Sequence, residues 1–252
     1  MGLPLDELTA YLDRFLRIAE VRDSPNALNG LQVANDGQVE RLAVAVDACQ
    51  ATIDGASERG ADTLIVHHGL FWGGLEPVTG RHGRRLRTLI QRGIALYSAH
   101  LPLDVHPEVG NNSVLARRLG VSQPEWFGEY EGQAIGVMGT LHVTRDVLVE
   151  QVTTLLGTVP NVIAAGPKTV HRIGIVTGGG GDLIKQAVDA GVDTYLTGEG
   201  KHHTYFDAEE FGVNVIYAGH YATETVGVKA LAEHLANRFD LPWDFLDHPT
   251  GL

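Results

Sequence analysis

The sequence predicts an α/β protein made of two similar α/β/α layered domains from an apparent tandem duplication. Three observations support this: strand-like and helix-like segments alternate, the alternation recurs in the second half, and identities repeat at one offset. Short β-branched runs between helix-length segments are typical of helices layered on a largely parallel sheet. The runs are LAVAVD, TLIVHH and IALYSAH in the first half and IGIVTGGGG, DTYLTGEG and VNVIYAGH in the second.

Helices are predicted before and between these runs. At the N-terminus one apolar face recurs with helical spacing, formed by Leu5, Leu8, Leu12, Phe15 and Ile18. Further helices are expected to end near Arg59, to cover residues 84–92, 183–190 and 207–211, and finally to end near Phe239. Residues 121–169 are less regular, and there SQPEWFGEYEGQ is predicted to be a loop and AIGVMGTLHV a strand.

The repeated identities lie 131 residues apart and pair Arg41, Ile53, Ala56, Gly60, Asp62, Thr63 and Gly69 with Arg172, Ile184, Ala187, Gly191, Asp193, Thr194 and Gly200. At an offset of 120, Tyr97, His100 and Asp104 pair with Tyr217, His220 and Glu224. We infer a duplication with domains at residues 1–125 and 126–252. A junction near residue 165 fits equally well, and the domains need not be continuous. The alternative is that two ordinary βαβ units share Gly-x-Asp-Thr by coincidence.

Composition excludes several classes of protein. The formal charge of -12 and the lack of a long basic cluster argue against nucleic acid as a partner. The only cysteine, Cys49, leaves no intramolecular disulfide and no thiolate cluster, so a metal site must use His, Asp and Glu. No window approaches the roughly 18 apolar residues of a membrane span, and the N-terminus lacks the basic start of a signal peptide. We therefore expect a cytoplasmic protein without a membrane partner.

Two adjacent histidines, His67 and His68, follow the apolar strand LIV and precede Gly69. Ligands collect at the carboxyl ends of parallel strands, and consecutive strand side chains point to opposite faces. The pair could therefore reach two different metal ions. The alternative is a hydrogen-bonded pair that caps the sheet.

A second group, His100, Asp104 and His106, follows the next strand in SAHLPLDVHPEVGNN. Asp104 is the best ligand candidate, and the flanking prolines stiffen its backbone. His100 is interpreted as a ligand or as a residue that orients one. His106 is predicted to be an exposed loop residue.

A third group places His220 at a strand end and Glu224 in the opening turn of the last helix. A carboxylate there is also explained by the helix dipole alone. If His67, His68, Asp104, His220 and Glu224 meet, they form a nitrogen and oxygen set suited to Zn, Mn, Fe or Ni. With Glu224 bridging, two divalent ions would lie roughly 3.5 to 4 Å apart, between the two domains, and activate a water for hydrolysis.

The four glycines of VTGGGGD are interpreted as a tight turn, with an anion-binding loop as the alternative. In TGEGKHHT, Glu199 is predicted to line the pocket or to support a ligand, and His202 and His203 to be exposed.

These motifs resemble the Nif-three-like, or YbgI-like, family, labelled GTP cyclohydrolase 1 type 2, over nearly the whole chain. The motifs are NGLQV, VHHGLFW, HLPLD, GNN, TGGGG, TGE and GHYATE. The resemblance implies a dinuclear metal centre on the five residues above with His100 nearby. It also implies a toroidal homohexamer, a trimer of dimers, whose metal sites face an internal cavity.

Two functions follow as expectations. The first is a dinuclear metal-dependent hydrolase that acts on a nucleotide or related phosphorylated compound, as a GTP cyclohydrolase would. The second is a non-enzymatic metal-binding scaffold that uses the surface of the hexamer for protein interaction.

Overall fold

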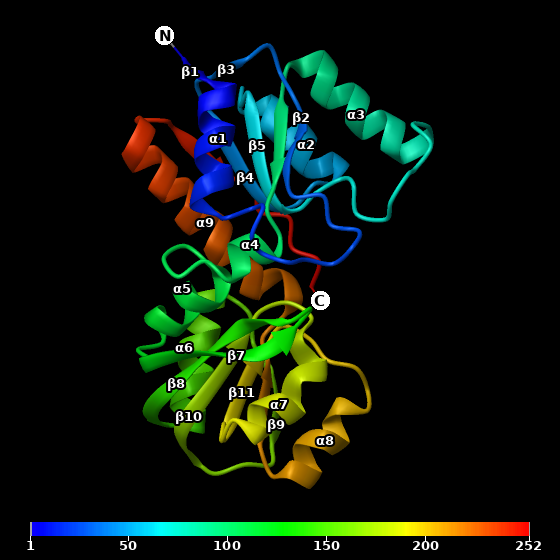
Figure 1. Ribbon diagram of the computed structural model, residues 1–252. Coiled ribbons are helices and arrows are strands. Elements are labelled where there is room, and N and C mark those ends of the chain that lie inside the picture. Colours follow the sequence, from blue (N-terminus) through cyan, green and yellow to red (C-terminus); the bar gives the residue numbers. More distant parts are fainter. Residues whose placement is uncertain (1, 252) are drawn as a thin grey trace. The chain divides into compact units, whose positions relative to one another are not determined.

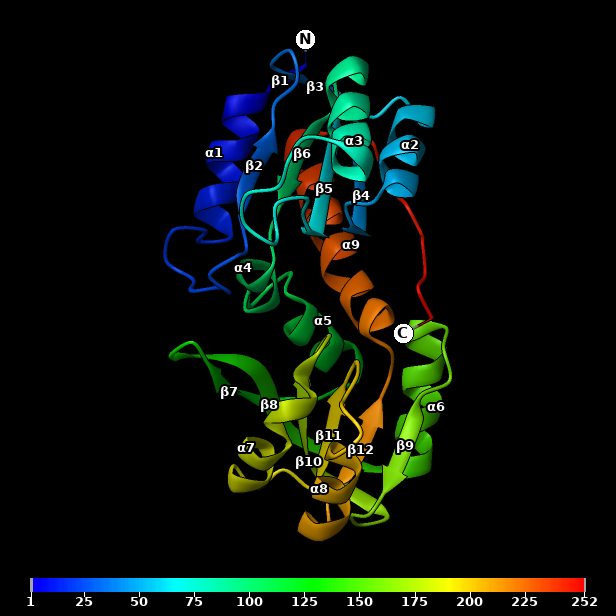
Figure 2. The ribbon, with the colours of Figure 1, turned by 90° about the vertical axis from the view of Figure 1, so that its right-hand side faces the viewer.

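The computed structural model describes residues 2–251, which divide into two compact units (Figures 1 and 2). Of the described residues, unit 1 comprises 2–109 and 228–248, and unit 2 comprises 110–227 and 249–251. Helix α9, His220–Phe239, contains the boundary at residue 227. The sequence-based division at residue 125 assigns all of α9 to the second domain. The units differ because Val228, Leu231 and Leu235 lie in the core of unit 1.

Within the described residues, unit 1 contains a five-stranded sheet in the order β13-β4-β5-β6-β2, in which only β2 is antiparallel to its neighbour. Its elements are β1 (Leu3–Pro4), α1 (Leu5–Phe15), β2 (Gly30–Val33), β3 (Gln38–Val39), β4 (Leu42–Asp47), α2 (Gln50–Glu58), β5 (Thr63–His68), α3 (Gly80–Arg92), β6 (Ala95–Ser98), α4 (Leu101–Asp104) and β13 (Trp243–Phe245).

Apolar side chains cover both faces of this sheet, because consecutive strand residues point to opposite sides. On one face Val44 and Ile65 pack with the buried leucines of α1 and with Leu231 and Leu235 of α9. On the other face Ala45, Leu64 and Val66 pack against α2 and α3. The predicted amphipathic helix at the N-terminus is confirmed, with Leu5, Leu8 and Leu12 buried. Burial on both faces also explains why the strands appear in the sequence as continuous apolar runs.

Unit 2 contains a six-stranded sheet in the order β7-β8-β10-β11-β12-β9 among the residues described. Its elements are α5 (Asn111–Arg118), β7 (Ser122–Tyr130), β8 (Gln133–Thr144), α6 (Arg145–Leu156), β9 (Asn161–Ala164), β10 (Thr169–Val176), the 3-10 helix η1 (Gly180–Leu183), α7 (Ile184–Asp189), β11 (Thr194–Thr197), α8 (Thr204–Phe211) and β12 (Asn214–Tyr217). Strands β10, β11 and β12 are parallel, and the remaining pairings are antiparallel.

Two sequence-based expectations need correction. The largely parallel arrangement holds for the sheet of unit 1, in which only β2 pairs antiparallel, but in unit 2 antiparallel strands flank a parallel core of three strands, so that both sheets are mixed. The segment predicted to be a loop is strand β7, which pairs antiparallel with β8. Its apolar pattern is weak because it is an edge strand with mostly exposed side chains, a positive φ of 50° at Gln123, and an irregular register between Ser122 and Glu125.

The repeated Gly-x-Asp-Thr sequence makes the same hydrogen bonds in both units. In unit 1, Asp62 accepts from the amides of Glu40 and Arg41 at 2.6 and 3.0 Å. In unit 2, Asp193 accepts from the amides of His171 and Arg172 at 2.9 and 3.0 Å. Each aspartate directly precedes one central strand and therefore ties the start of that strand to the chain at the preceding strand, β4 in unit 1 and β10 in unit 2.

Candidate metal centre

The histidines of unit 1 lie at the carboxyl end of β5, where the sequence predicts them. The ring of His67 is fully buried, and its Nδ1 lies 3.0 Å from the carbonyl oxygen of Ala99. Nδ1 of His68 lies 2.9 Å from Oδ1 of Asp47, the residue opposite it in strand β4. The two rings are 4.6 Å apart between centroids. Neighbouring strand ends thus supply both the histidines and the groups that orient them.

His100 completes a cluster with these two residues. It precedes α4, and its ring centroid lies 5.0 Å from that of His67 and 5.6 Å from that of His68. One nitrogen from each of the three rings lies within 4.8 Å of the others. Nδ1 of His100 contacts Oδ1 of Asp23 at 2.7 Å. Such a group of imidazoles could hold a metal ion.

Asp23 is a site residue that the sequence does not single out. Its Oδ2 also accepts from the Leu101 amide at 3.1 Å and from the Asn29 side chain at 2.8 Å. Burial acts to raise the pKa of Asp23, but the hydrogen bonds from His100, Asn29 and Ser24 and the charge of His100 outweigh it and lower the pKa. Asp23 therefore stays ionised and fixes the ring of His100.

Asp104 lies at the end of α4 and is buried, with Oδ2 3.6 Å from Nε2 of His67. Its carboxylate therefore faces the ring nitrogen of His67 that is turned away from Ala99. This position agrees with a role as a ligand beside His67.

The histidine orientations share one chemical feature. In each ring Nδ1 faces an acceptor: Ala99 for His67, Asp47 for His68, Asp23 for His100, and Glu199 for His220 in unit 2. A neutral imidazole that donates from Nδ1 keeps a lone pair on Nε2, and metal-binding histidines are commonly oriented in this way. The donor set thus fits a transition-metal ion.

In unit 2, His220 is the first residue of α9 and Glu224 lies one turn later. Glu224 is therefore in the second turn, not in the opening turn that the sequence suggested, because the helix begins at the histidine itself. Oε1 of the buried Glu224 lies 3.1 Å from Nε2 of His220, and Oε1 of Glu199 lies 2.8 Å from Nδ1. The hydrogen bond with Glu224 is the largest cause that raises the pKa of His220 to about 9; burial opposes the shift, and the charge of Glu224 and the contact with Glu199 add to it.

The glycine-rich turn packs against this pair. Gly178 has a φ of 66°, and a Cβ there would contact Oε1 of Glu224 and lie 3.2 Å from Nε2 of His220. The Gly178 amide donates to Thr223 at 3.0 Å, and the Gly181 amide donates to the carbonyl of Glu199 at 3.1 Å. These contacts favour the interpretation as a tight turn, whose glycines leave room for the two side chains.

Two asparagine motifs hold the half-sites in place. In unit 1, Asn29 of NGLQV accepts from the His100 amide at 2.8 Å. In unit 2, Asn112 of GNN accepts from the Thr177 amide at 2.8 Å, and Asn111 accepts from the Gly227 amide at 2.7 Å. These residues position the backbone around the histidines and do not themselves supply ligands to the clusters.

The remaining histidines of the motifs divide into buried and exposed. His106 was predicted to be exposed but is buried, with Nε2 3.0 Å from the carbonyl of Phe15 and its ring 4.2 Å from the Phe15 ring. The loop that carries His106 folds back onto α1. His202 and His203 are exposed, as predicted. Trp72, which the sequence did not single out, packs edge-on at 4.6 Å from the ring of His100.

The fold and the side-chain clusters define an α/β protein with two mixed sheets and groups of histidines and carboxylates that could bind metal ions. The family model for Duf34/NIF3 (NGG1p interacting factor 3) matches residues 3–250. The chain belongs to this family, which confirms the resemblance inferred from the motifs.

Relatives match over nearly the whole chain. A protein of Deinococcus radiodurans named GTP cyclohydrolase 1 type 2 homolog is 45% identical over 249 residues, which cover 98% of this chain and 94% of that protein. A crystal structure of a Thermus thermophilus protein superposes with a TM-score of 0.91 and 47% identity, covering 99% of this chain and 100% of the other. The protein ybgI, whose function is described as unknown, gives a TM-score of 0.92 at 38% identity over 99% and 100% of the two chains.

The helices that the structure describes include none that is both long and apolar enough to cross a membrane.

Proposed function

We propose that this chain is a dinuclear metal-dependent hydrolase that uses the histidine and carboxylate clusters described above as metal ligands. The observation that supports it is the shared orientation of His67, His68, His100 and His220, whose Nδ1 atoms all face protein acceptors. Because an ordinary surface histidine has no need of a fixed tautomer, the recurrence of this arrangement favours ligand binding.

The proposed ligands are His67, His68 and Asp104 from unit 1 and His220 and Glu224 from unit 2, with Glu224 as the bridge. His100 stands beside the first group, and Glu199 fixes the ring of His220 at 2.8 Å. Bound divalent ions would supply Lewis acidity and an activated water. The mixture of imidazole and carboxylate suits Zn, Mn, Fe or Ni better than Ca.

The proposed substrate is a nucleotide or a related phosphorylated compound. Relatives at about 45% identity are named GTP cyclohydrolase 1 type 2 homolog. The chain carries a net charge of -12, so a phosphorylated substrate needs local positive charge, and two bound cations would supply it. GTP is therefore the first compound to test.

The test uses metal-loaded protein and a panel of nucleotides, with release of formate and of phosphate as separate readouts. We expect turnover of at least one nucleotide by the wild type and its loss in Glu224→Gln. Glu233→Gln, an exposed position on the same helix, should keep the activity. Protein shown to hold two ions per chain that releases neither product from any nucleotide would refute the hydrolase.

We also propose the homohexamer, a trimer of dimers, that the family resemblance implies. Support comes from β7, an edge strand that exposes Trp126 and Tyr130 in the described part of unit 2. Exposed aromatic side chains on an edge strand favour contact with another chain. Analytical ultracentrifugation should give six chains per particle, and a monomer at micromolar concentration would contradict the proposal.

The same edge strand favours the second candidate function, a non-enzymatic scaffold. This role predicts that partner binding survives loss of the metal ligands. A pull-down that compares wild type with the His67→Ala and His68→Ala double variant distinguishes the two functions, because a hydrolase loses its activity in this variant whereas a scaffold keeps its partners.

We infer, finally, that the two units arose by tandem duplication. Support comes from Asp62 and Asp193, which lie 131 residues apart and make matching hydrogen bonds to the preceding strand. Superposition of β4, β5 and β6 on β10, β11 and β12 tests it, since a common origin requires Arg41 to fall on Arg172.

A further inference from the structure

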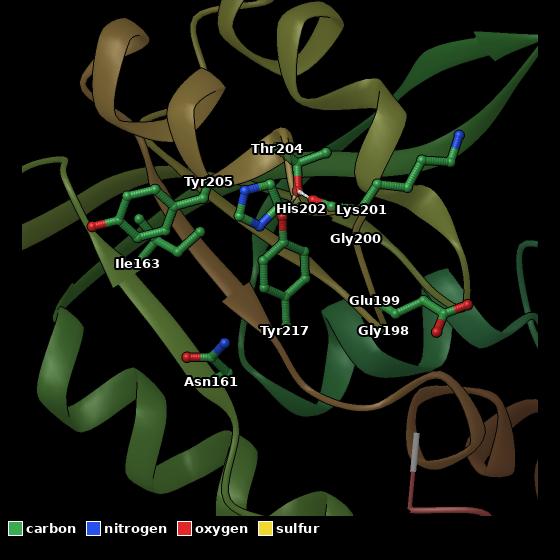
Figure 3. A pocket seen from close by; sticks show the side chains of 10 residues that line it. All are labelled: Asn161, Ile163, Gly198, Glu199, Gly200, Lys201, His202, Thr204, Tyr205 and Tyr217. Atoms are coloured by element: carbon green, nitrogen blue, oxygen red, sulfur yellow. Dashed lines mark hydrogen bonds between the residues drawn. The ribbon is translucent and has the colours of Figure 1, made fainter.

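A cavity of about 380 Å³ lies in unit 2 beside the candidate metal ligand His220 (Figure 3). It is bounded by β9, by the start of α8, by the loop 198–202 and by Tyr217 at the end of β12. The rings of Tyr205, Tyr217 and His202 and the side chain of Ile163 form much of its wall, with Asn161 at one side and Glu199 at another. This volume lies in the range of sites for small ligands.

The wall is held in shape by contacts within unit 2. The Tyr217 hydroxyl lies 2.5 Å from Oγ1 of the buried Thr204, drawn as a dashed line in Figure 3. The Tyr205 hydroxyl donates to Glu209 at 3.0 Å. Gly200 lies against the Tyr217 ring so closely that a Cβ would stand 2.6 Å from ring carbons. The cavity is therefore formed before any ligand arrives, and Gly200 keeps it open.

The charges around the cavity favour a neutral ligand group. Lys201 is its only lysine or arginine among the described lining residues, and the Nζ of this lysine lies 2.5 Å from Oδ2 of Asp182. Glu199 contributes a carboxylate. Because the one ammonium group is already balanced, a phosphate would gain little attraction here. Aromatic side chains with a few polar groups beside them suit a planar ring as ligand. Such a ring can stack on an aromatic face whatever its ring atoms are.

Glu199 connects the cavity with the candidate metal ligand of unit 2. It lines the cavity, and its Oε1 accepts from Nδ1 of His220 at 2.8 Å. The side chain is half exposed. A ligand in the cavity would lie next to the residue that orients a proposed metal ligand.

We propose that this cavity binds the planar nitrogen heterocycle of the substrate, with the ring against Tyr205. The inference rests on the proposed function for the choice of a nucleotide as substrate. It assigns the neutral base to the cavity and leaves the phosphates outside it, where the proposed cations lie. Binding of a free nucleoside, which has no phosphate, follows directly.

The test measures binding of guanosine and, separately, of tripolyphosphate to metal-loaded full-length protein by calorimetry. The variants are Tyr205→Ala and Tyr205→Phe, with Phe211→Ala as control. Phe211 is matched because it is an exposed aromatic residue of the same helix α8, 42% exposed against 46% for Tyr205, and does not line the cavity. All these side chains are exposed enough that folding should be retained, which circular dichroism checks.

We expect Tyr205→Ala to bind guanosine about tenfold more weakly than wild type. Tyr205→Phe and Phe211→Ala should bind it like wild type, and tripolyphosphate binding should be unchanged in all variants. Equal guanosine binding by Tyr205→Ala, or no guanosine binding by wild type at millimolar concentration, overturns the assignment. Nucleotide turnover with an unchanged KM in Tyr205→Ala would refute the cavity alone. Guanosine binding through Tyr205 without any nucleotide turnover would refute the hydrolase alone.

Discussion

Oε1 of Glu224 lies 3.1 Å from Nε2 of His220, and the two residues are one turn apart on α9. Side chains at positions i and i+4 share one side of a helix. Nδ1 of the same ring faces Glu199. Nε2 of His220 is therefore turned toward the carboxylate of Glu224. The start of α9 thus supplies two ligand groups of different chemistry, whose relative position is fixed by helical geometry.

Replacing Glu224 by Gln should lower the number of metal ions bound per chain. The amide keeps the size of the side chain but loses the negative charge, so we expect at least about a tenfold loss of metal affinity, the effect usual even for groups outside the ligand set. Mass spectrometry of the metals after dialysis measures it. Glu233→Gln is the control, and an equal metal content in both variants would contradict a ligand role.

Asp47 should matter for metal binding although it is not a proposed ligand. It holds Nδ1 of His68 at 2.9 Å, so Asp47→Ala frees the ring to rotate and should weaken metal binding about 10–100-fold. Asp54→Ala, an exposed position on the neighbouring helix α2, is the matched control. Titration with Zn and a competing chelator measures both affinities. A variant that binds Zn like wild type would show that the ring needs no orientation.

The sequence predicted the histidine clusters because strand ends are easy to recognise. An apolar run that stops at two histidines can be assigned from local pattern alone, and parallel strands gather such ends at one edge of a sheet. The correct positions of His67, His68 and His100 in unit 1 follow from this rule. The orienting acceptors were missed because Asp23 and Asp47 contact histidines 77 and 21 residues away, at distances along the chain that only the folded sheet defines.

The errors have a common physical cause. Strand β7 was taken for a loop because an edge strand needs no apolar face, and its hydrogen bonds to β8 leave no local pattern. His106 was taken for a surface residue because its partner Phe15 is 91 residues away. The exact start of α9, and with it the turn that holds Glu224, belongs to the element boundaries that local sequence defines least well.

Gly178→Ala should damage the half-site of unit 2, whereas Gly179→Ala should not. A Cβ at residue 178 would contact Glu224, and a φ of 66° is strained by about 1–2 kcal/mol for a non-glycine residue. At residue 179 the nearest atoms to a Cβ lie at 3.8 and 3.9 Å. We expect lower metal content and a lower melting temperature only for Gly178→Ala. Equal behaviour of the two variants would mean that the turn moves freely.

Leu235→Ala should destabilise unit 1 although residue 235 is far along the chain from the other residues of that core. The side chain is fully buried among residues of α1 and the first sheet, and such truncations cost about 2–5 kcal/mol. Ile90→Ala, at a position that is 68% exposed, should cost less than about 0.5 kcal/mol. Urea unfolding measures both. A small effect at residue 235 would show that α9 contributes little to unit 1.

Unit 1 should lose stability as the pH falls below the usual histidine pKa. Burial is the main cause that lowers the pKa of His106, opposed by the hydrogen bond with Phe15 and the charge of Glu108 and assisted by His234 and Arg17. Burial also lowers the pKa of His234, opposed by Glu108 and assisted by Arg238. The unfolded chain therefore takes up protons first, near pH 6.5.

The unfolded state then binds more protons than the folded state. The free energy of unfolding therefore has its full value above about pH 6.5 and decreases as the pH falls through the lowered pKa values of His106 and His234. His234→Phe keeps an aromatic ring against Phe15, whose centroid lies 4.2 Å away, but removes one titrating group. We expect the free energy of unfolding of this variant, measured in urea, to decrease less than that of the wild type between about pH 6.5 and pH 5. His248→Phe, at an exposed position, should keep the wild-type slope. If His234→Phe keeps it too, protonation of His234 does not drive the loss.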